Sequence, residues 1–319
     1  MSCITSKKER LEKELKILWF IFKFKFATKE DLDLFGSCFL NHPHMRRTIE
    51  NLLKKGFIKS FDIRSSIYTI GYCLKPAGVR AFLERFGFFK KYKYAFNPID
   101  YGELLFDHRQ GLIKTFFAMA KHNGIWTSEW MVRKDYYRGR KIGGRSRSRR
   151  RLPDAIYKVP DGDGKIDIEF ERTQKSLTKW ESMIEDLKRD IWVKDHLGYN
   201  ATLKGKWKRT IQAVLFVFED KSLKKIYQRN VRVNYKIHVL DKLEKKWDSE
   251  EMKKYFLNDW EDVYKRFFFA TIEDLKEDFV YDQAKKQVLI TDLFKFADSD
   301  PFLEREKDRE AYLKSWDRI

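Results

Sequence analysis

Residues 151–175 of the chain read RLPDAIYKVPDGDGKIDIEFERTQK, and this stretch decides the fold expected for the second half of the protein. Its first run, Arg151–Val159, is apolar and β-prone around a single acid. The segment PDGDG at 160–164 supplies the Gly, Pro and Asp residues that tight turns favour. Apolar and acidic residues alternate in the second run, Ile166–Phe170, as in a strand with two different faces. The pattern predicts a hairpin of two short strands.

Four acids lie on the two predicted strands of this hairpin. Asp154 belongs to the first strand, and Asp167, Glu169 and Glu171 share one face of the second. Pairing of the strands would bring Asp154 close to Glu169 and Glu171. Carboxylates brought together repel one another unless a divalent cation or a basic side chain accompanies them. The hairpin is thus a candidate metal site, and the alternative is a solvated acidic face without a ligand.

Composition restricts the class of protein. A length of 319 residues suggests two domains, or three small ones, and 43% hydrophobic residues suffice for folded cores. The longest apolar stretch is interrupted by Lys23 and Lys25, and the charged N-terminus does not read as a signal peptide. The three cysteines are scattered without a Cys-x-x-Cys pair. These features predict a cytoplasmic protein with no membrane partner, no disulfide framework and no zinc site.

The net charge of +19 is unevenly distributed along the chain. Residues 1–151 contain 33 Lys and Arg against 14 Asp and Glu, whereas residues 152–319 contain 34 basic and 34 acidic residues. The whole excess lies in the first half, which indicates a polyanion partner for that half, most often nucleic acid. A membrane surface is the weaker alternative, because no amphipathic basic helix with a clean apolar face accounts for the excess.

Periodicity in the first half predicts a series of short elements. Helices are expected over 7–26, 28–35, 43–55 and 76–86, and strands over 57–62 and 67–72. Thr28 is expected to cap the second helix, which has acids in its first turn. The order of helix, helix, basic helix and two-stranded wing resembles the winged-helix family over roughly residues 10–88. In that family the third helix enters the major groove and the wing touches phosphate, so the resemblance implies double-stranded DNA as the partner.

The winged-helix resemblance assigns DNA contact to basic side chains of the third helix and the wing, namely His44, Arg46, Arg47, Lys54 and Arg64. Phosphate contacts give affinity and base-edge contacts give sequence preference, and both remain open for these residues. One alternative is a winged helix that makes protein contacts. Another is a transcriptional regulator that uses residues 1–90 alone. Winged-helix proteins often dimerise, so a homodimer is also considered, although the residues indicate no interface.

Two basic segments follow the predicted winged helix. Residues 90–101 (KKYKYAFNPIDY) mix Lys with aromatic residues and read as a linker, whose rings either pack or stack on unpaired bases. Residues 138–151 (RGRKIGGRSRSRRR) contain eight basic residues, three glycines and no acid, which predicts a flexible cationic loop. This loop immediately precedes Asp154 and would deliver a phosphate backbone to the candidate metal site. Its candidate DNA contacts are Arg145, Arg147, Arg149 and Arg150.

The elements expected around the hairpin have a definite order. They are helices over 104–122, 178–196 and 222–230 and strands over 125–132, 209–218 and 235–240. This order, with Pro153-Asp154 and then Glu169-Phe170-Glu171, resembles the metal-dependent nuclease superfamily that carries a Pro-Asp and an (Asp/Glu)-x-Lys motif. The resemblance implies that Asp154 and Glu169 hold Mg²⁺ or Mn²⁺.

The chain departs from that nuclease motif at one position, because Glu171 replaces the Lys. In the family this Lys positions or activates the attacking water. Lys175, four residues further on, would supply the missing charge from a following helix, so Glu171 and Lys175 are the candidates for orienting the water. Glu103 or Asp107 on the preceding helix would complete the metal ligands.

A winged helix followed by Pro153-Asp154-Ala155 and Glu169-Phe170-Glu171-Arg172-Thr173 is similar to the replication-relaxation family of plasmids and integrative elements, over roughly residues 10–240. The resemblance implies a DNA-binding protein of a mobile element, in replication control or mobilisation, with a metal-dependent endonuclease-like site that cuts or nicks DNA. A relaxase, a replication protein or another element-encoded protein would be its partner. The alternative is a non-catalytic accessory or regulatory protein with an inert nuclease-like domain.

The chain is thus expected to combine α+β or α/β parts in a definite order. They are a winged-helix DNA-binding domain over 1–90, a linker over 91–103, a nuclease-like domain over 104–245 and a mostly helical C-terminal extension over 246–319.

Overall fold

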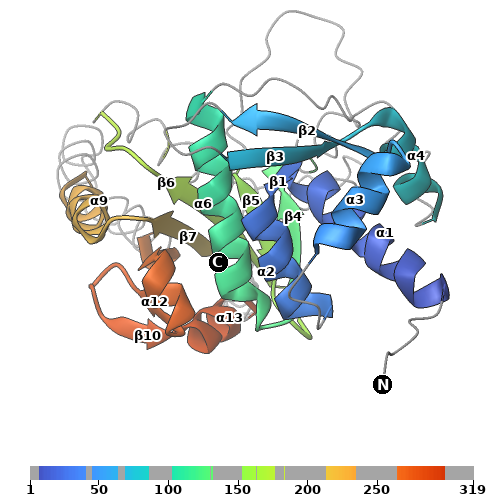
Figure 1. Ribbon diagram of the computed structural model, residues 1–319. Coiled ribbons are helices and arrows are strands. Elements are labelled where there is room, and N and C mark those ends of the chain that lie inside the picture. Colours follow the sequence, from blue (N-terminus) through green and yellow to red (C-terminus); the bar gives the residue numbers. More distant parts are fainter. Residues whose placement is uncertain are drawn as a thin grey trace, which may run out of the picture. The chain divides into compact units, whose positions relative to one another are not determined.

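The computed structural model consists of two compact units of mixed α and β structure, as the sequence predicts at the level of fold class (Figure 1). The first unit comprises residues 1–113 with 133–140, and the second comprises residues 114–132 with 141–319. Helix α6 (Glu103–Ala120) contributes to both units. The structure describes residues 7–40, 45–63, 69–85, 103–129, 131, 153–162, 164–176, 183, 213–234 and 264–298.

The first unit packs helices against a small antiparallel sheet. Its elements are α1 (Lys7–Phe24), β1 (Phe26–Thr28), α2 (Lys29–Leu40), α3 (Arg46–Lys54), β2 (Ile58–Ile63), β3 (Thr69–Leu74) and α4 (Pro76–Arg85). The strand order is β1-β3-β2. Aromatic rings on α1 fill the core, where Phe20 stacks on Phe35 with centroids 4.7 Å apart and Phe22 meets Phe82 at 4.8 Å.

The first helix ends earlier than its periodicity predicts. Lys25 has a φ of 68°, a left-handed conformation that interrupts the helical backbone. The chain then forms β1, in which Phe26 pairs with Cys73 of β3. Phe26 is fully buried in this strand. The apolar periodicity of residues 7–26 includes Phe26 because the buried strand places this side chain in the same core as the helix.

The second unit is built on a seven-stranded mixed sheet of order β10-β9-β8-β7-β6-β5-β4. Its strands are β4 (Ile125–Ser128), β5 (Ala155–Lys158), β6 (Lys165–Glu171), β7 (Ala213–Phe218), β8 (Phe267–Thr271), β9 (Phe279–Tyr281) and β10 (Gln287–Leu289). The three central strands β6, β7 and β8 run parallel, and the flanking pairs are antiparallel. The predicted hairpin is therefore confirmed as β5 and β6.

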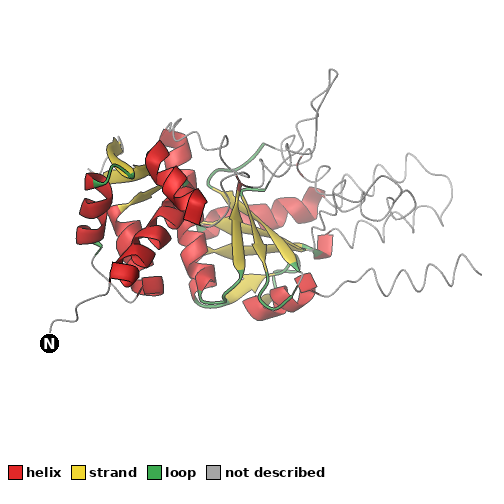
Figure 2. Ribbon diagram, turned by 90° about the vertical axis from the view of Figure 1, so that its right-hand side faces the viewer, coloured by secondary structure: helices red, strands yellow, loops and turns green. Residues whose placement is uncertain are grey.

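Helices cover both faces of this sheet (Figure 2). On one face, Leu223, Tyr227 and Val231 of α9 (Lys221–Asn234) pack into a core cluster with apolar residues of β7 and β8. On the other face, α6 and α13 (Ile290–Asp298) supply rings that contact the strands, such as Phe294 stacked on Tyr157 with centroids 5.4 Å apart. A short helix, α12 (Ile272–Lys276), follows β8. Strand β6 thus lies between two covered faces.

The described part of the C-terminal extension belongs to the same sheet as the hairpin. Residues 267–289 form three strands of the same sheet, because the apolar run Phe267–Thr271 pairs in parallel with β7. The helix expected over 178–196, apart from Met183, the strand over 235–240, the linker over 91–102 and the cationic loop over 138–151 lie outside the described residues. Within the described residues, no helix combines the length and apolar character needed to cross a membrane.

Candidate functional site

Asp154 lies directly before β5, at the end of the hairpin where β6 carries Glu169. The paired residues of the two strands begin with Ala155 of β5 opposite Ile168 of β6, so Asp154 is a bend residue at the edge of the pairing and not part of the strand. Asp154 Oδ2 also accepts a hydrogen bond from Phe170 N at 2.9 Å, which holds this carboxylate against the acidic strand.

The acidic face of β6 is buried. Asp167, Glu169 and Glu171 are exposed by 3%, 4% and 6%. The parallel register places Glu169 beside Phe216 and Glu171 beside Phe218, both of which belong to the core under α9. The alternative of a solvated acidic face is therefore wrong. Burial of a carboxylate costs several kcal/mol unless charges or hydrogen bonds compensate it, so this face requires specific partners.

Glu171 has two such partners. Lys175 Nζ forms an ion pair with Glu171 Oε1, and the hydroxyl of Tyr227 donates to Glu171 Oε2 at 3.0 Å. The same hydroxyl lies 3.0 Å from the carbonyl oxygen of Thr173, so one phenolic hydrogen is shared between two acceptors. Lys175 is thus paired with Glu171, and it lies in the irregular segment 172–176 rather than on the helix expected from the sequence. Tyr227 is fully buried on α9 and stiffens this arrangement.

A further acid borders Asp154. Ser128 of β4 is opposite Ala155, and Glu129 N donates to the carbonyl oxygen of Asp154 at 2.8 Å, so Glu129 follows the strand on the same side as Asp154. Of the two helix acids considered from the sequence, Asp107 lies on the part of α6 that belongs to the first unit. The side chain of Glu103 lies outside the described residues.

A magnesium ion at these carboxylates would need further ligands from water and from the substrate. Among the described residues, no group of three or more His, Cys, Asp and Glu side chains is arranged to hold a metal ion. Mg²⁺, however, is usually bound by one or two carboxylates together with water and substrate phosphates. Asp154 Oδ2 accepts from Phe170 N, which directly follows Glu169 in β6. These two residues would hold the ion.

The predicted DNA-binding helix is α3. Arg47 and Lys54 are exposed on it and form no ion pair within the described part of the chain, whereas Arg46 Nε donates to Glu50 Oε1 at 2.9 Å. Glu50 therefore offsets part of the positive charge of this helix. The other predicted DNA contacts lie outside the described residues: His44, Arg64, Arg145, Arg147, Arg149 and Arg150.

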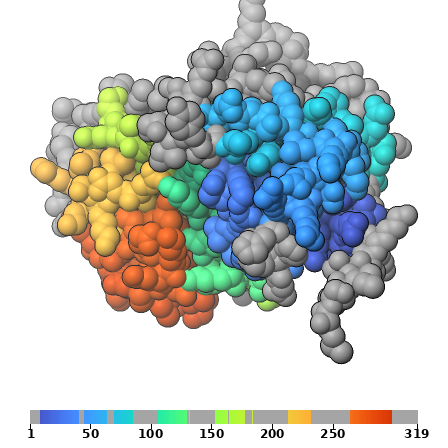
Figure 3. All heavy atoms as spheres, in the orientation of Figure 1, coloured from blue at the N-terminus to red at the C-terminus, as the bar shows by residue number. Residues whose placement is uncertain are grey.

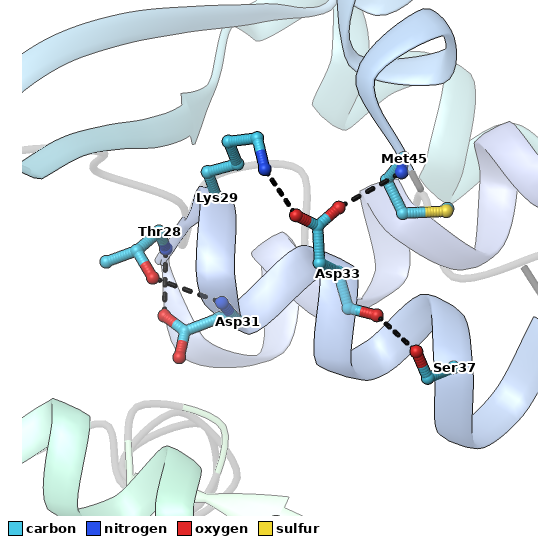
Figure 4. A network of polar contacts seen from close by, with 6 residues as sticks. All are labelled: Thr28, Lys29, Asp31, Asp33, Ser37 and Met45. Atoms are coloured by element: carbon cyan, nitrogen blue, oxygen red, sulfur yellow. Dashed lines mark hydrogen bonds and ion pairs between the residues drawn. The ribbon is translucent and has the colours of Figure 1, made fainter. Parts of the chain in front are cut away.

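Side chains of α2 position the start of α3 (Figure 4). Asp33 Oδ1 accepts from Met45 N at 3.0 Å, and Asp33 Oδ2 accepts from Lys29 Nζ at 2.5 Å. The N-terminus of α2 is capped as predicted, since Thr28 Oγ1 accepts from Asp31 N at 3.1 Å and Asp31 Oδ2 accepts from Thr28 N at 2.8 Å. Asp33 thereby links a well-capped helix to the first turn of the basic helix.

Sequence reasoning did not identify Tyr227, Glu129 or Asp33 as contributors. In the sequence, Tyr227 looks like one more apolar position on the buried side of α9. Its hydroxyl contacts Glu171 only because β6 and β7, which are distant in sequence, pair in parallel. Glu129 reads as part of a longer strand, because the end of β4 at Ser128 carries no turn signal.

A scan against protein-family models, a search of curated proteins and a search of solved structures each found no match to this chain.

Proposed function

We propose that the protein binds double-stranded DNA and cuts or nicks it with the help of a divalent metal ion. The observation that supports this proposal is the position of Asp154, whose carboxylate accepts a hydrogen bond from Phe170 N, next to the buried acidic face of β6 that carries Glu169. Carboxylates gathered at one place repel one another, and a divalent cation offsets that repulsion. A divalent cation that is shared with a DNA phosphate would use that charge.

The roles of the residues follow from their chemistry. Mg²⁺ or Mn²⁺ held by Asp154 and Glu169 would polarise the phosphate that is to be attacked. Glu171 would accept a hydrogen bond from the attacking water, while Lys175 and Tyr227 fix the orientation of its carboxylate. Because the ammonium and the phenol hold opposite oxygens of one carboxylate, Glu171 has little freedom to rotate away.

The first unit supports the DNA-binding part of the proposal. Its order of three helices, a two-stranded antiparallel pair and a closing helix is compatible with a winged helix. Arg47 and Lys54 are seven residues apart on α3, which is two helical turns, so they project from the same face. This face would contact the DNA backbone. A role in the replication or mobilisation of a mobile element is part of the same proposal and rests on the family resemblance.

A second candidate is a non-catalytic DNA-binding protein. It is favoured by the ion pair between Lys175 and Glu171, because a Lys that neutralises a neighbouring Glu is less available to a water molecule. In this case the acidic face would serve stability and the first unit would carry the function.

The test compares matched variants on supercoiled plasmid with Mg²⁺ or Mn²⁺ at low salt. Asp154→Asn removes a candidate metal ligand, and Asp161→Asn makes the same change at an exposed position in the turn of the same hairpin. Nicking or linearisation by the wild type and by Asp161→Asn, lost in Asp154→Asn, would support the nuclease. Equal DNA binding by all three proteins with no cleavage would favour the second candidate, and absence of DNA binding would refute both.

A further inference from the structure

Helix α9 concentrates positive charge in a half of the chain that is neutral as a whole. Its sequence, KSLKKIYQRNVRVN, contains five basic residues and no acid, whereas residues 152–319 as a whole contain 34 basic and 34 acidic residues. Lys221, Lys225 and Arg229 are all exposed. They stand four residues apart, so they form one stripe with steps of about 6 Å along the helix axis. We call these three residues the α9 stripe.

The side chains of the α9 stripe make no hydrogen bond or ion pair within the part of the chain that the structure describes. Some other exposed lysines of the second unit are neutralised, for example Lys276 by Glu273 at 2.8 Å and Lys295 by Asp292 at 3.0 Å. Like charges four residues apart destabilise a helix by about 0.2–0.5 kcal/mol per pair. The stripe is therefore an unfavourable arrangement for the isolated protein, and a polyanion would relieve it.

The opposite side of α9 is buried against the sheet. Leu223, Tyr227 and Val231 pack in the core, and Lys224 is buried in an ion pair with Asp274 at 2.7 Å. The helix therefore cannot rotate to hide its stripe, and Figure 3 shows α9 open at the molecular surface. A rigid helix with fixed, solvated charges is a suitable support for a repeating anionic ligand.

We propose that the α9 stripe binds the phosphate backbone of double-stranded DNA, as a contact surface additional to α3. This inference rests on the proposed function as a DNA-binding protein. A lipid surface fits less well, because a helix that lies on a membrane inserts its apolar side, and the apolar side of α9 is buried in the core. A protein partner also fits less well, because protein interfaces favour aromatic residues and Arg and are depleted in Lys.

The contact has a quantitative signature. Each phosphate neutralised by Lys or Arg contributes about 0.9 to the slope of log K against log salt concentration for duplex DNA. Three contacts would contribute about 2.7, so between 50 and 200 mM salt they account for about a 40-fold loss of affinity. Removal of the stripe should lower the slope by up to this amount and should weaken binding at low salt to every duplex sequence.

The experiment measures the binding of the full-length protein to a fluorescent duplex across this salt range. The stripe variant is Lys221→Gln, Lys225→Gln, Arg229→Gln. The control variant is Lys276→Gln, Lys286→Gln, Lys295→Gln, which removes the same charge from exposed positions of the second unit. The inference predicts a reduced slope for the stripe variant, a slope near the wild-type value for the control, and retained binding when Lys221 and Lys225 are changed to Arg.

Three outcomes would overturn the inference. If the wild type binds and both triple variants lose the same amount of affinity, net charge explains the effect and the stripe has no special role. If the stripe variant keeps the wild-type slope, α9 makes no phosphate contact, while DNA binding itself stands. If the wild type binds anionic phospholipid vesicles but no duplex at any salt concentration, both the stripe contact and the proposed function fail.

Discussion

Tyr227→Phe removes one hydroxyl from the site and leaves the packing of the ring in place. The ring lies 4.9 Å from that of Phe218, centroid to centroid, and Phe retains this contact. The lost group is the donor to Glu171 Oε2 at 3.0 Å, and Glu171 is only 6% exposed. A hydrogen bond to a charged group contributes about 1.5–3 kcal/mol, so the variant should lower the local stability of β6 and α9 by this amount.

The measurement is hydrogen exchange of backbone amides in peptides from β6 and α9, followed by mass spectrometry. A loss of 1.5–3 kcal/mol corresponds to amides that exchange about 10- to 150-fold faster. Tyr264→Phe is the matched control, because the hydroxyl of the half-buried Tyr264 lies 3.5 Å from the carbonyl oxygen of Gln283, a distance at which a hydrogen bond is weak. This control should change exchange by less than about threefold.

A double-mutant cycle tests the cause of the effect. In a Glu171→Gln background the acceptor is uncharged, so Tyr227→Phe should cost about 0.5–1.5 kcal/mol instead of 1.5–3 kcal/mol. The reasoning would be refuted if Tyr227→Phe exchanged no faster than Tyr264→Phe. It would also be refuted if the cost were the same with Glu and with Gln at position 171, since the hydroxyl would then not act through the carboxylate.

Three further predictions concern stability. Burial lowers the pKa of Lys23 to about 7, so between pH 7 and 10.5 the unfolded chain binds more protons than the folded chain, and wild-type stability rises with pH. Lys23→Met should abolish this rise, as measured by urea unfolding at pH 7 and pH 10. Burial raises the pKa of Asp274, but hydrogen bonds from Lys224 and Thr271 outweigh this effect and leave the pKa lowered. Asp274→Asn should therefore reduce the free energy of unfolding by about 1–3 kcal/mol at pH 7. A series of denaturation curves should show this difference vanishing as the pH falls below 3.8. A Cβ at Gly78 would lie 2.1 Å from a backbone carbonyl oxygen, so Gly78→Ala should lower the thermal midpoint of the first unit with a loss of about 1–3 kcal/mol, and an unchanged midpoint would contradict the described packing.

The elements of the hairpin could be predicted because their signals are local. The alternation in Ile166–Phe170 and the turn residues before it specify two strands and their pairing, and this pairing alone brings Asp154 to the end of the hairpin where β6 carries Glu169. The burial of the acidic face could not be predicted in this way. It depends on β7 and α9, which are joined to β6 through residues 172–212, and a strand of alternating acids normally presents them to water.

The same distinction explains the other differences. The capping of α2 by Thr28 and Asp31 involves neighbours in sequence and was predicted for Thr28. The partners Tyr227 for Glu171 and Asp33 for Met45 are joined by tertiary packing, and no spacing rule connects them. The α9 stripe was overlooked because the balance of charges over residues 152–319 conceals a helix that contains no acid.

Strand β5 and helix α9, which both contact β6, are synthesised at different times. Strand β5 pairs with β6 across the short turn at 159–164, so the hairpin that carries Asp154 and Glu169 forms by rapid local closure. Tyr227 lies 58 positions beyond Glu169 and is synthesised about 3–12 s later at about 5–20 residues per second. Until α9 has been synthesised, the hairpin lacks the helix whose Tyr227 holds Glu171 in the folded protein.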